Sequence, residues 1–184
     1  MAGKAAQLSV QDRPFASELS ISTKQQYSPR FQAIYWMKPQ SHLFKLNTDG
    51  GFNDRLKQAG GGGILRDQAG ELQFAFSLCY ASSSSLESEM KALLHGMQIC
   101  EDKGTAEAPW RQWDLMENLK HKMELLQAKV QHCFREANMV SDELATWGLK
   151  GCNQIYEKQD QLPRKVKGLL LLDTQALPTL RRTK

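Results

Sequence analysis

The chain has 184 residues, of which 41% are hydrophobic and 24% charged. This composition is that of an ordinary soluble protein, and the length fits one domain with tails. The formal net charge of +4 permits an acidic partner such as nucleic acid without requiring one. No apolar run approaches the roughly 20 residues of a bilayer span, which excludes a membrane-spanning role.

The four cysteines stand far apart and form no CxxC pair, which argues against a zinc site. We expect reduced thiols in an intracellular protein, located in the nucleus or cytoplasm rather than in an organelle.

Residues 1–40 are rich in Ser, Gln and Ala without a sustained period, and we expect an irregular lead-in. Residues 43–51 then predict a strand that carries Asp49, and residues 60–66 and 71–80 predict a β-hairpin, so that the three strands form a meander. The glycine run 60–63 is not interpreted as a phosphate loop, because a phosphate loop opens directly into a helix. Close backbone packing in a strand explains it better.

Apolar residues recur at helical spacing from Leu86 to Cys100, and again after Pro109 up to Leu126. Residues 128–135 can form a short strand, and a last helix containing Val140, Leu144 and Trp147 ends at Gly148. We therefore expect an α/β domain over residues 41–150. Residues 151–184 are polar and basic, and we expect a mostly irregular tail.

Three carboxylates lie at informative points of these elements: Asp49 on the first strand, Glu89 on the first helix and Asp142 in the first turn of the last helix. Such oxygen ligands suit Mg²⁺, and two ions together can activate water for phosphodiester hydrolysis. Spacing alone does not carry this hypothesis, because an Asp on a strand is more often a turn or edge residue and a helical Glu is usually solvated. Glu87 is a rival to Glu89, since both flank the apolar stripe.

Four segments in order add a further pattern: KLNTDG at residues 45–50, GGGGILRDQAG at 60–70, EMKAL at 89–93 and REANMVSDELA at 135–145. With Trp36, Lys38 and Pro39 before them and LPRKV at 162–166 after them, they resemble the plant RNase H-like family. This family comprises relatives of type 1 ribonuclease H and domains derived from retrotransposons. The order and spacing of the segments, rather than any one of them, carry the resemblance.

The resemblance implies an RNase H-like three-layer fold with a mixed sheet, in which a parallel strand adds to the antiparallel meander and helices flank both faces. It assigns Asp49, Glu89 and Asp142 as catalytic and metal-binding residues, with Mg²⁺ or Mn²⁺ as the cofactor, two ions in the family. The family's Glu directly precedes the x-x-Ala-Leu of the helix, which favours Glu89 over Glu87. The implied partner is nucleic acid, an RNA–DNA hybrid or an RNA duplex, contacted by Asn47, Lys91, Arg135 and Asn138. Asn138 can also serve as the N-cap of the last helix.

One part of the family pattern is missing. The family's fourth strand supplies a further catalytic Asp and lies between the first strand and the last, but here residues 101–104 run directly into 105–110. We therefore expect a truncated fold, shortened near residues 104–109, that binds one ion or none. Glu107 or Asp114 are conceivable substitutes.

Three functions remain open from the sequence. The first is metal-dependent hydrolysis of the RNA strand of RNA–DNA hybrids, by ancestry and with impaired activity. The second is a non-catalytic module that binds nucleic acid through phosphates and 2′-hydroxyls. The third is a splice or retroelement remnant without a selected activity.

Overall fold

The computed structural model describes residues 29–104 and 115–183. Residues 32–181 form one compact unit, and the second unit comprises residues 1–31 and 182–184. The predicted deletion near residues 104–109 and the candidate substitutes Glu107 and Asp114 fall on a part of the chain that lies outside the described residues.

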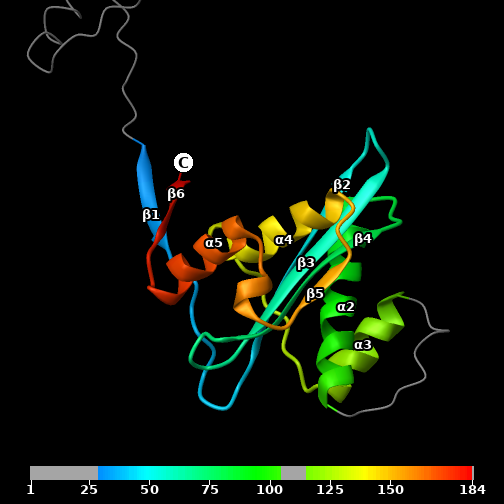
Figure 1. The fold of residues 1–184 in the computed structure, drawn as a ribbon, viewed down its shortest axis with the longest axis horizontal. Coiled ribbons are helices and arrows are strands. Elements are labelled where there is room, and N and C mark those ends of the chain that lie inside the picture. Colours follow the sequence, from blue (N-terminus) through cyan, green and yellow to red (C-terminus); the bar gives the residue numbers. More distant parts are fainter. Residues whose placement is uncertain (1–28, 105–114, 184) are drawn as a thin grey trace, which may run out of the picture. The chain divides into compact units, whose positions relative to one another are not determined.

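A four-stranded sheet lies at the centre of the larger unit (Figure 1), with the order β2–β3–β4–β5. Its strands are β2 (Lys45–Asn53), β3 (Gln58–Arg66), β4 (Leu72–Tyr80) and β5 (Gln154–Tyr156). All three pairings are antiparallel, and Asp49 stands opposite Gly62. The predicted meander is confirmed, because β2, β3 and β4 follow one another in the chain and in the sheet. A separate two-stranded sheet pairs β1 (Arg30–Ile34) with β6 (Thr179–Thr183).

Helices cover both faces of the four-stranded sheet. Among the described residues they are α2 (Ser85–Gly104), α3 (Leu115–Leu125), α4 (Met139–Leu149) and α5 (Arg164–Thr174). Successive residues of a strand point to opposite faces, and a side chain on Gly61 would meet Ala92 of α2 whereas one on Gly62 would meet Ala145 of α4. The helices α2 and α4 therefore lie on opposite faces, as Figure 1 also shows. The predicted fold class, an α/β fold of three layers, is confirmed.

Each face has its own hydrophobic core, because β4 alternates its side chains between them. Phe74 and Phe76 pack with Ile99 on the face of α2. Ala75 packs with Ile64 on the face of α4, together with residues of α4, α5 and the chain around β5: Val140, Leu144, Tyr156, Leu162, Val166 and Leu170.

Two predicted elements differ from the structure. The predicted parallel strand at residues 128–135 is wrong: these residues are irregular up to a short 3-10 helix, η3 (Arg135–Ala137). A strand needs a hydrogen-bonding neighbour, and β2 has β3 as its one partner in the described sheet. Residues 151–183 also contain β5, α5 and β6 where we expected an irregular tail. Val166 and Leu170, four residues apart, are buried in the core, which explains why α5 forms there.

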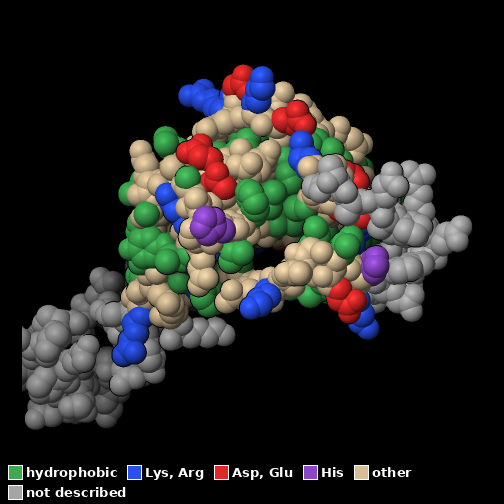
Figure 2. All heavy atoms as spheres, turned by 90° about the horizontal axis from the view of Figure 1, so that it is seen from below, with side chains coloured by type: hydrophobic (Ala, Val, Ile, Leu, Met, Phe, Trp, Pro, Cys, Tyr) green, Lys and Arg blue, Asp and Glu red, His purple; other side chains and the backbone are tan. Residues whose placement is uncertain are grey.

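An open hollow of about 2250 Å³ lies beside β2. Most of β2, the inner side of α2 and the irregular residues 126–134 line it, and Figure 2 shows the hollow bordered by hydrophobic side chains. Large apolar side chains remain exposed around it: Leu43, Phe44, Leu86, Val130 and Phe134. The hollow lies between β2 and residues 126–134, where the missing strand was predicted, and the deletion itself stays a prediction.

Candidate metal and nucleic-acid site

Asp49 and Asp142 meet on the face of the sheet that α4 covers. Asp49 lies in the middle of β2 opposite Gly62, and a side chain on Gly62 would come under 3.0 Å from the backbone nitrogen of Ala145. The glycine therefore lets α4 rest directly on the backbone of β3, which brings the first turn of α4 next to β2. Asp142, in that first turn, is close enough to Asp49 that it raises the pKa of the Asp49 carboxyl group.

The pKa of Asp49 is raised from 3.8 to about 6. The largest cause is partial burial, which disfavours the charged carboxylate, and the second is the negative charge of Asp142. The charge of Glu89 acts in the same direction, whereas the charge of Arg135 opposes these effects. Like charges held this close favour any cation that enters between them.

Glu89 approaches from the opposite face. A side chain on Gly50 would come under 3.0 Å from the backbone nitrogen of Glu89, so this glycine lets α2 lie against β2. Glu89 is exposed and lines the hollow together with Asp49 and Asp142. Glu89 acts on Asp49 through its negative charge.

Glu87 has a different position from its rival Glu89. Its carboxylate accepts hydrogen bonds from the backbone N–H and the hydroxyl of Ser83, and it forms an ion pair of 2.7 Å with Lys91. These contacts hold the pKa of Glu87 down, at about 2. Glu87 thus stabilises the start of α2, and it does not line the hollow.

The four candidate nucleic-acid contacts divide into two groups. Asn47 is 5% exposed and its side-chain oxygen accepts hydrogen bonds from Trp36 and Arg66, so its position does not support a contact with nucleic acid. Lys91 is engaged by Glu87 and by the carbonyl oxygen of Ala81, away from the hollow. Arg135 and Asn138 line the hollow beside Asp142, and Asn47 also lines it, although its side-chain oxygen is already occupied.

Asn138 joins the start of α4 to β2. Its Nδ2 donates a hydrogen bond of 3.0 Å to the carbonyl oxygen of Thr48, next to Asp49. Asn138 occupies the N-cap position of α4, as predicted, but its side chain makes no capping hydrogen bond there. Its Oδ1 is buried and has no hydrogen-bond partner among the described residues. This oxygen is a polar atom that a cation or an ordered water would satisfy.

Arg135 occupies the other side of Asp142. Its Nη2 donates a hydrogen bond of 2.7 Å to Oδ1 of Asp142, although the arginine side chain is 81% exposed. A positive group therefore already neutralises one of the two paired carboxylates.

The donor set fits a divalent cation of the Mg²⁺ type in part. Across residues 29–104 and 115–183, no group of three or more His, Cys, Asp or Glu side chains is close enough to hold a metal ion. Mg²⁺, however, often takes one or two carboxylates and completes its shell with water and substrate phosphate. Asp49 and Asp142 supply such a pair, with the unpartnered Oδ1 of Asn138 at the same end of α4.

A second network, to which the sequence analysis gave no role, fixes the position of β2. Arg66 is 1% exposed, stacks on the ring of Trp36 at 3.5 Å and forms an ion pair of 2.7 Å with Asp173 of α5. It also donates a hydrogen bond to Asn47, two residues before Asp49. Trp36 and Arg66 both lie in the segments that carry the family resemblance, and this was the only signal for them.

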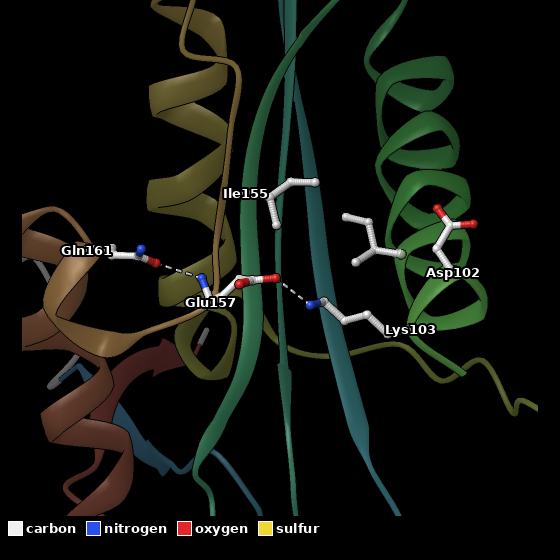
Figure 3. Close-up of a pocket in the computed structure, with 6 residues that line it drawn as sticks. Asp102, Lys103, Ile155, Glu157 and Gln161 are labelled. Atoms are coloured by element: carbon white, nitrogen blue, oxygen red, sulfur yellow. Dashed lines mark hydrogen bonds and ion pairs between the residues drawn. The ribbon is translucent and has the colours of Figure 1, made fainter. Parts of the chain in front are cut away.

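A smaller pocket, of about 360 Å³, lies between the end of α2 and β5. Figure 3 shows Lys103 pointing to Glu157, whose backbone N–H donates to the side chain of Gln161. None of the predicted site residues lines it. Lys103, Glu157 and Gln161 are connected to one another, and Asp102 accepts a hydrogen bond from Gln98. Its contacts connect α2 with β5.

No helix among the described residues has the length and apolar content to cross a membrane.

One family model matches the central segment of the chain. Residues 47–108 match the model of the reverse transcriptase-like family. This segment includes Asp49 and Glu89, whereas Asp142 lies beyond it. No curated protein matches the chain.

Solved structures with a similar arrangement include two ribonuclease H proteins. The RNase H1 of Halobacterium salinarum NRC-1 is 18% identical, with a TM-score of 0.46 over 58% of this chain and 97% of that one. The N-terminal RNase H domain of a Mycobacterium tuberculosis protein, fused to maltose-binding protein, is 14% identical, with a TM-score of 0.45 over 59% and 94%. The protease–reverse transcriptase of prototype foamy virus is 14% identical, with a TM-score of 0.38 over 60% and 21%. Likenesses at this level assign no residue roles.

Proposed function

We propose that this chain, whose residues 47–108 match the reverse transcriptase-like family model, contains an RNase H-like domain that binds RNA–DNA hybrids and hydrolyses their RNA strand with a divalent-cation-dependent, impaired activity. The observation that supports this proposal is the close approach of Asp49 and Asp142, which line one hollow where α4 lies directly on the sheet and Asn138 contacts Thr48. Two acids held together in a partly buried place raise the energy of the cation-free site, and a divalent ion lowers it.

In this proposal Asp49 and Asp142 hold one Mg²⁺ or Mn²⁺ ion, and Glu89 adds negative charge from the other side of β2. A bound ion of this kind lowers the pKa of water and neutralises the phosphodiester. The residues of the chain orient the site: Asn138 fixes the start of α4 against Thr48, and Arg66 with Trp36 fixes Asn47 beside Asp49.

The same arrangement explains why we propose an impaired activity. Glu89 lies on the face of α2, whereas the pair lies on the face of α4, so the three carboxylates do not converge as a cage. Fewer anionic ligands hold the cation more weakly, and the second ion of a two-ion mechanism lacks dedicated ligands among the described residues.

A non-catalytic nucleic-acid-binding module is the second candidate, and one observation favours it. Arg135 is bound to Asp142, as a cation would be, and its exposed guanidinium can reach a phosphate. This module would hold an RNA–DNA hybrid without cutting it.

The test is cleavage of a labelled RNA–DNA hybrid with Mg²⁺ or Mn²⁺ by the wild-type chain, Asp49→Asn and the control Asp54→Asn. Asp54 is an exposed acid in the turn that follows β2. We expect slow cleavage that Asp49→Asn abolishes and Asp54→Asn leaves unchanged. Cleavage that survives Asp49→Asn would refute the assigned site. Hybrid binding without cleavage by any variant would refute hydrolysis and support the second candidate.

A further inference from the structure

Arg66 and Arg135 each form an ion pair with an aspartate, but Arg66 is buried and Arg135 is exposed. Arg66 is 1% exposed and is held by Trp36, Asn47 and Asp173 together. The side chain of Arg135 is 81% exposed, and the one hydrogen bond described for its guanidinium goes to Asp142 at 2.7 Å. Its contact with Asp142 is therefore an exposed ion pair at the edge of a partly buried acid pair.

The backbone of Arg135, unlike its side chain, is fixed. Its carbonyl oxygen accepts the N–H of Asn138 at 2.9 Å, and the carbonyl oxygen of Asn138 accepts the N–H of Asp142 at 3.0 Å. These turns connect η3 to α4, so the arginine side chain starts from a constant point beside Asp142 and can rotate into the solvent.

We propose that Arg135 is an exchangeable counter-ion of the site: its guanidinium neutralises Asp142 when no divalent cation is bound, and a cation bound by Asp49 and Asp142 releases it to contact a phosphate of the nucleic acid. The inference rests on the proposed function to the extent that the acid pair binds a cation. It adds that Arg135 and the cation compete for Asp142, which the proposed function does not state.

Two physical arguments support the exchange. An exposed ion pair contributes little free energy, so one guanidinium is a weak competitor for a carboxylate that a divalent ion also binds. The released guanidinium is planar with five N–H donors, which match the oxygens of a phosphate in a bidentate contact. Because Arg135 lines the hollow beside Asp49, Asn138 and Asp142, a phosphate bound at a cation there would lie within its reach.

The first test is calorimetric titration of Mn²⁺ into the wild-type chain, Arg135→Gln and Arg181→Gln. Arg181 is the matched control, because it contacts Glu136 and the ring of Phe134, next to Arg135, without touching Asp142. We expect Arg135→Gln to bind Mn²⁺ about two- to fivefold more tightly than the wild type, the factor that corresponds to losing an exposed ion pair. Arg181→Gln removes the same charge and should leave the affinity close to that of the wild type.

The second test measures the affinity for a labelled RNA–DNA hybrid against salt concentration by fluorescence anisotropy. With saturating Mn²⁺, Arg135→Gln should reduce the number of phosphate contacts derived from the salt dependence by about one, and without Mn²⁺ it should not. The salt dependence distinguishes a released arginine from one that stays on Asp142.

The outcomes separate this inference from the proposed function. If Mn²⁺ binds the wild type and Asp49→Asn abolishes this binding, but Arg135→Gln leaves the affinity unchanged or weaker, the exchange is refuted and the cation site stands. If the wild type, Arg135→Gln and Asp49→Asn all fail to bind Mn²⁺, both the exchange and the metal-dependent function are refuted.

Discussion

Burial and three neighbouring residues act on the carboxyl group of Asp49 at the same time. Partial burial, the charge of Asp142 and the charge of Glu89 favour its protonated form, and the charge of Arg135 favours its ionised form. The carboxylate is therefore held where its ionisation is unfavourable in the absence of a cation. Groups in this condition are common at functional sites, because a ligand of the opposite charge relieves the unfavourable energy.

This condition predicts how Asp49→Asn changes stability with pH. The pKa of Asp49 is about 6 in the folded chain and 3.8 as its ordinary value, so ionisation opposes folding. The penalty is absent below the ordinary value, grows between the two values and is complete above about pH 6. In metal-free buffer near pH 8, the free energy of unfolding of Asp49→Asn should therefore exceed that of the wild type by about 1–2 kcal/mol, a range that allows for solvent screening.

Urea denaturation of both proteins near pH 8 and near pH 3.5 measures this difference. We expect the two proteins to be nearly equally stable at the acidic value, where Asp49 is mostly protonated in both the folded and the unfolded state. A wild type as stable as Asp49→Asn near pH 8 would contradict the electrostatic description of the site.

Part of the site could be predicted from single residues. Asp49 and Asp142 lie in segments whose order and spacing resemble a known family, so their roles could be named before the fold was seen. The choice between Glu87 and Glu89 could not be made from periodicity. Contacts of Glu87 with Ser83 and Lys91, which a helical repeat does not reveal, distinguish the two positions. Asn47 stays a predicted nucleic-acid contact, and the sequence did not indicate that its side-chain oxygen is bound by Trp36 and Arg66.

At the scale of elements, the glycines of β3 set the distance between the sheet and its helices. A side chain on Gly60 or Gly62 would collide with the backbone of α4, and one on Gly61 would meet Tyr80 and Ala92. This close packing on both faces is what the glycine run was predicted to provide. The position of Asp142 relative to Asp49 depends on it.

Gly62→Ala should therefore destabilise the fold by at least about 2 kcal/mol, because backbone atoms of α4 leave no room for a methyl group. The matched control is Gly168→Ala in α5, where an added side chain meets nothing within 4 Å. That substitution should stabilise the chain by about 0.5–1 kcal/mol through helix propensity. Thermal and urea unfolding of the two variants measure both effects, and a Gly62→Ala variant as stable as the wild type would contradict the close approach of α4.

The elements that the sequence analysis misjudged were short or depended on distant partners. Residues 128–135 have a strand-like composition, but in the described structure they lie across the hollow from β2 and have no sheet neighbour. The helix α5 was missed because Arg164, Lys165 and Lys167 suggested a solvated tail. Its buried Val166 and Leu170 are spaced at four residues, which was a usable signal.

The larger unit, residues 32–181, combines a complete core with an incomplete sheet edge. Hydrophobic clusters fill both faces of the sheet, and Arg66 connects α5 to β3 through Asp173. Beside β2, however, the hollow of about 2250 Å³ leaves apolar side chains exposed. Among the described residues, the open side of the sheet is the edge of β2, the strand that carries Asp49.

This distribution also explains the proposed function at the scale of the molecule. Two carboxylates depend on the contact between α4 and β3, which is tightly packed, and they come together. The third depends on α2 at the open edge and remains exposed. In the proposed function, this arrangement gives one cation an acid pair and leaves a second cation with weaker ligands.

The most direct test of the central claim, that Asp49 and Asp142 form one acid pair that binds a divalent cation, is a pH titration of the Asp49 carboxyl carbon by NMR, with and without Mg²⁺. Without Mg²⁺, we expect the pKa of Asp49 to be about 6, and saturating Mg²⁺ should lower it by at least about one unit, because the cation favours the ionised form. A carboxyl group that titrates near its ordinary value of 3.8 and does not respond to Mg²⁺ would contradict the claim.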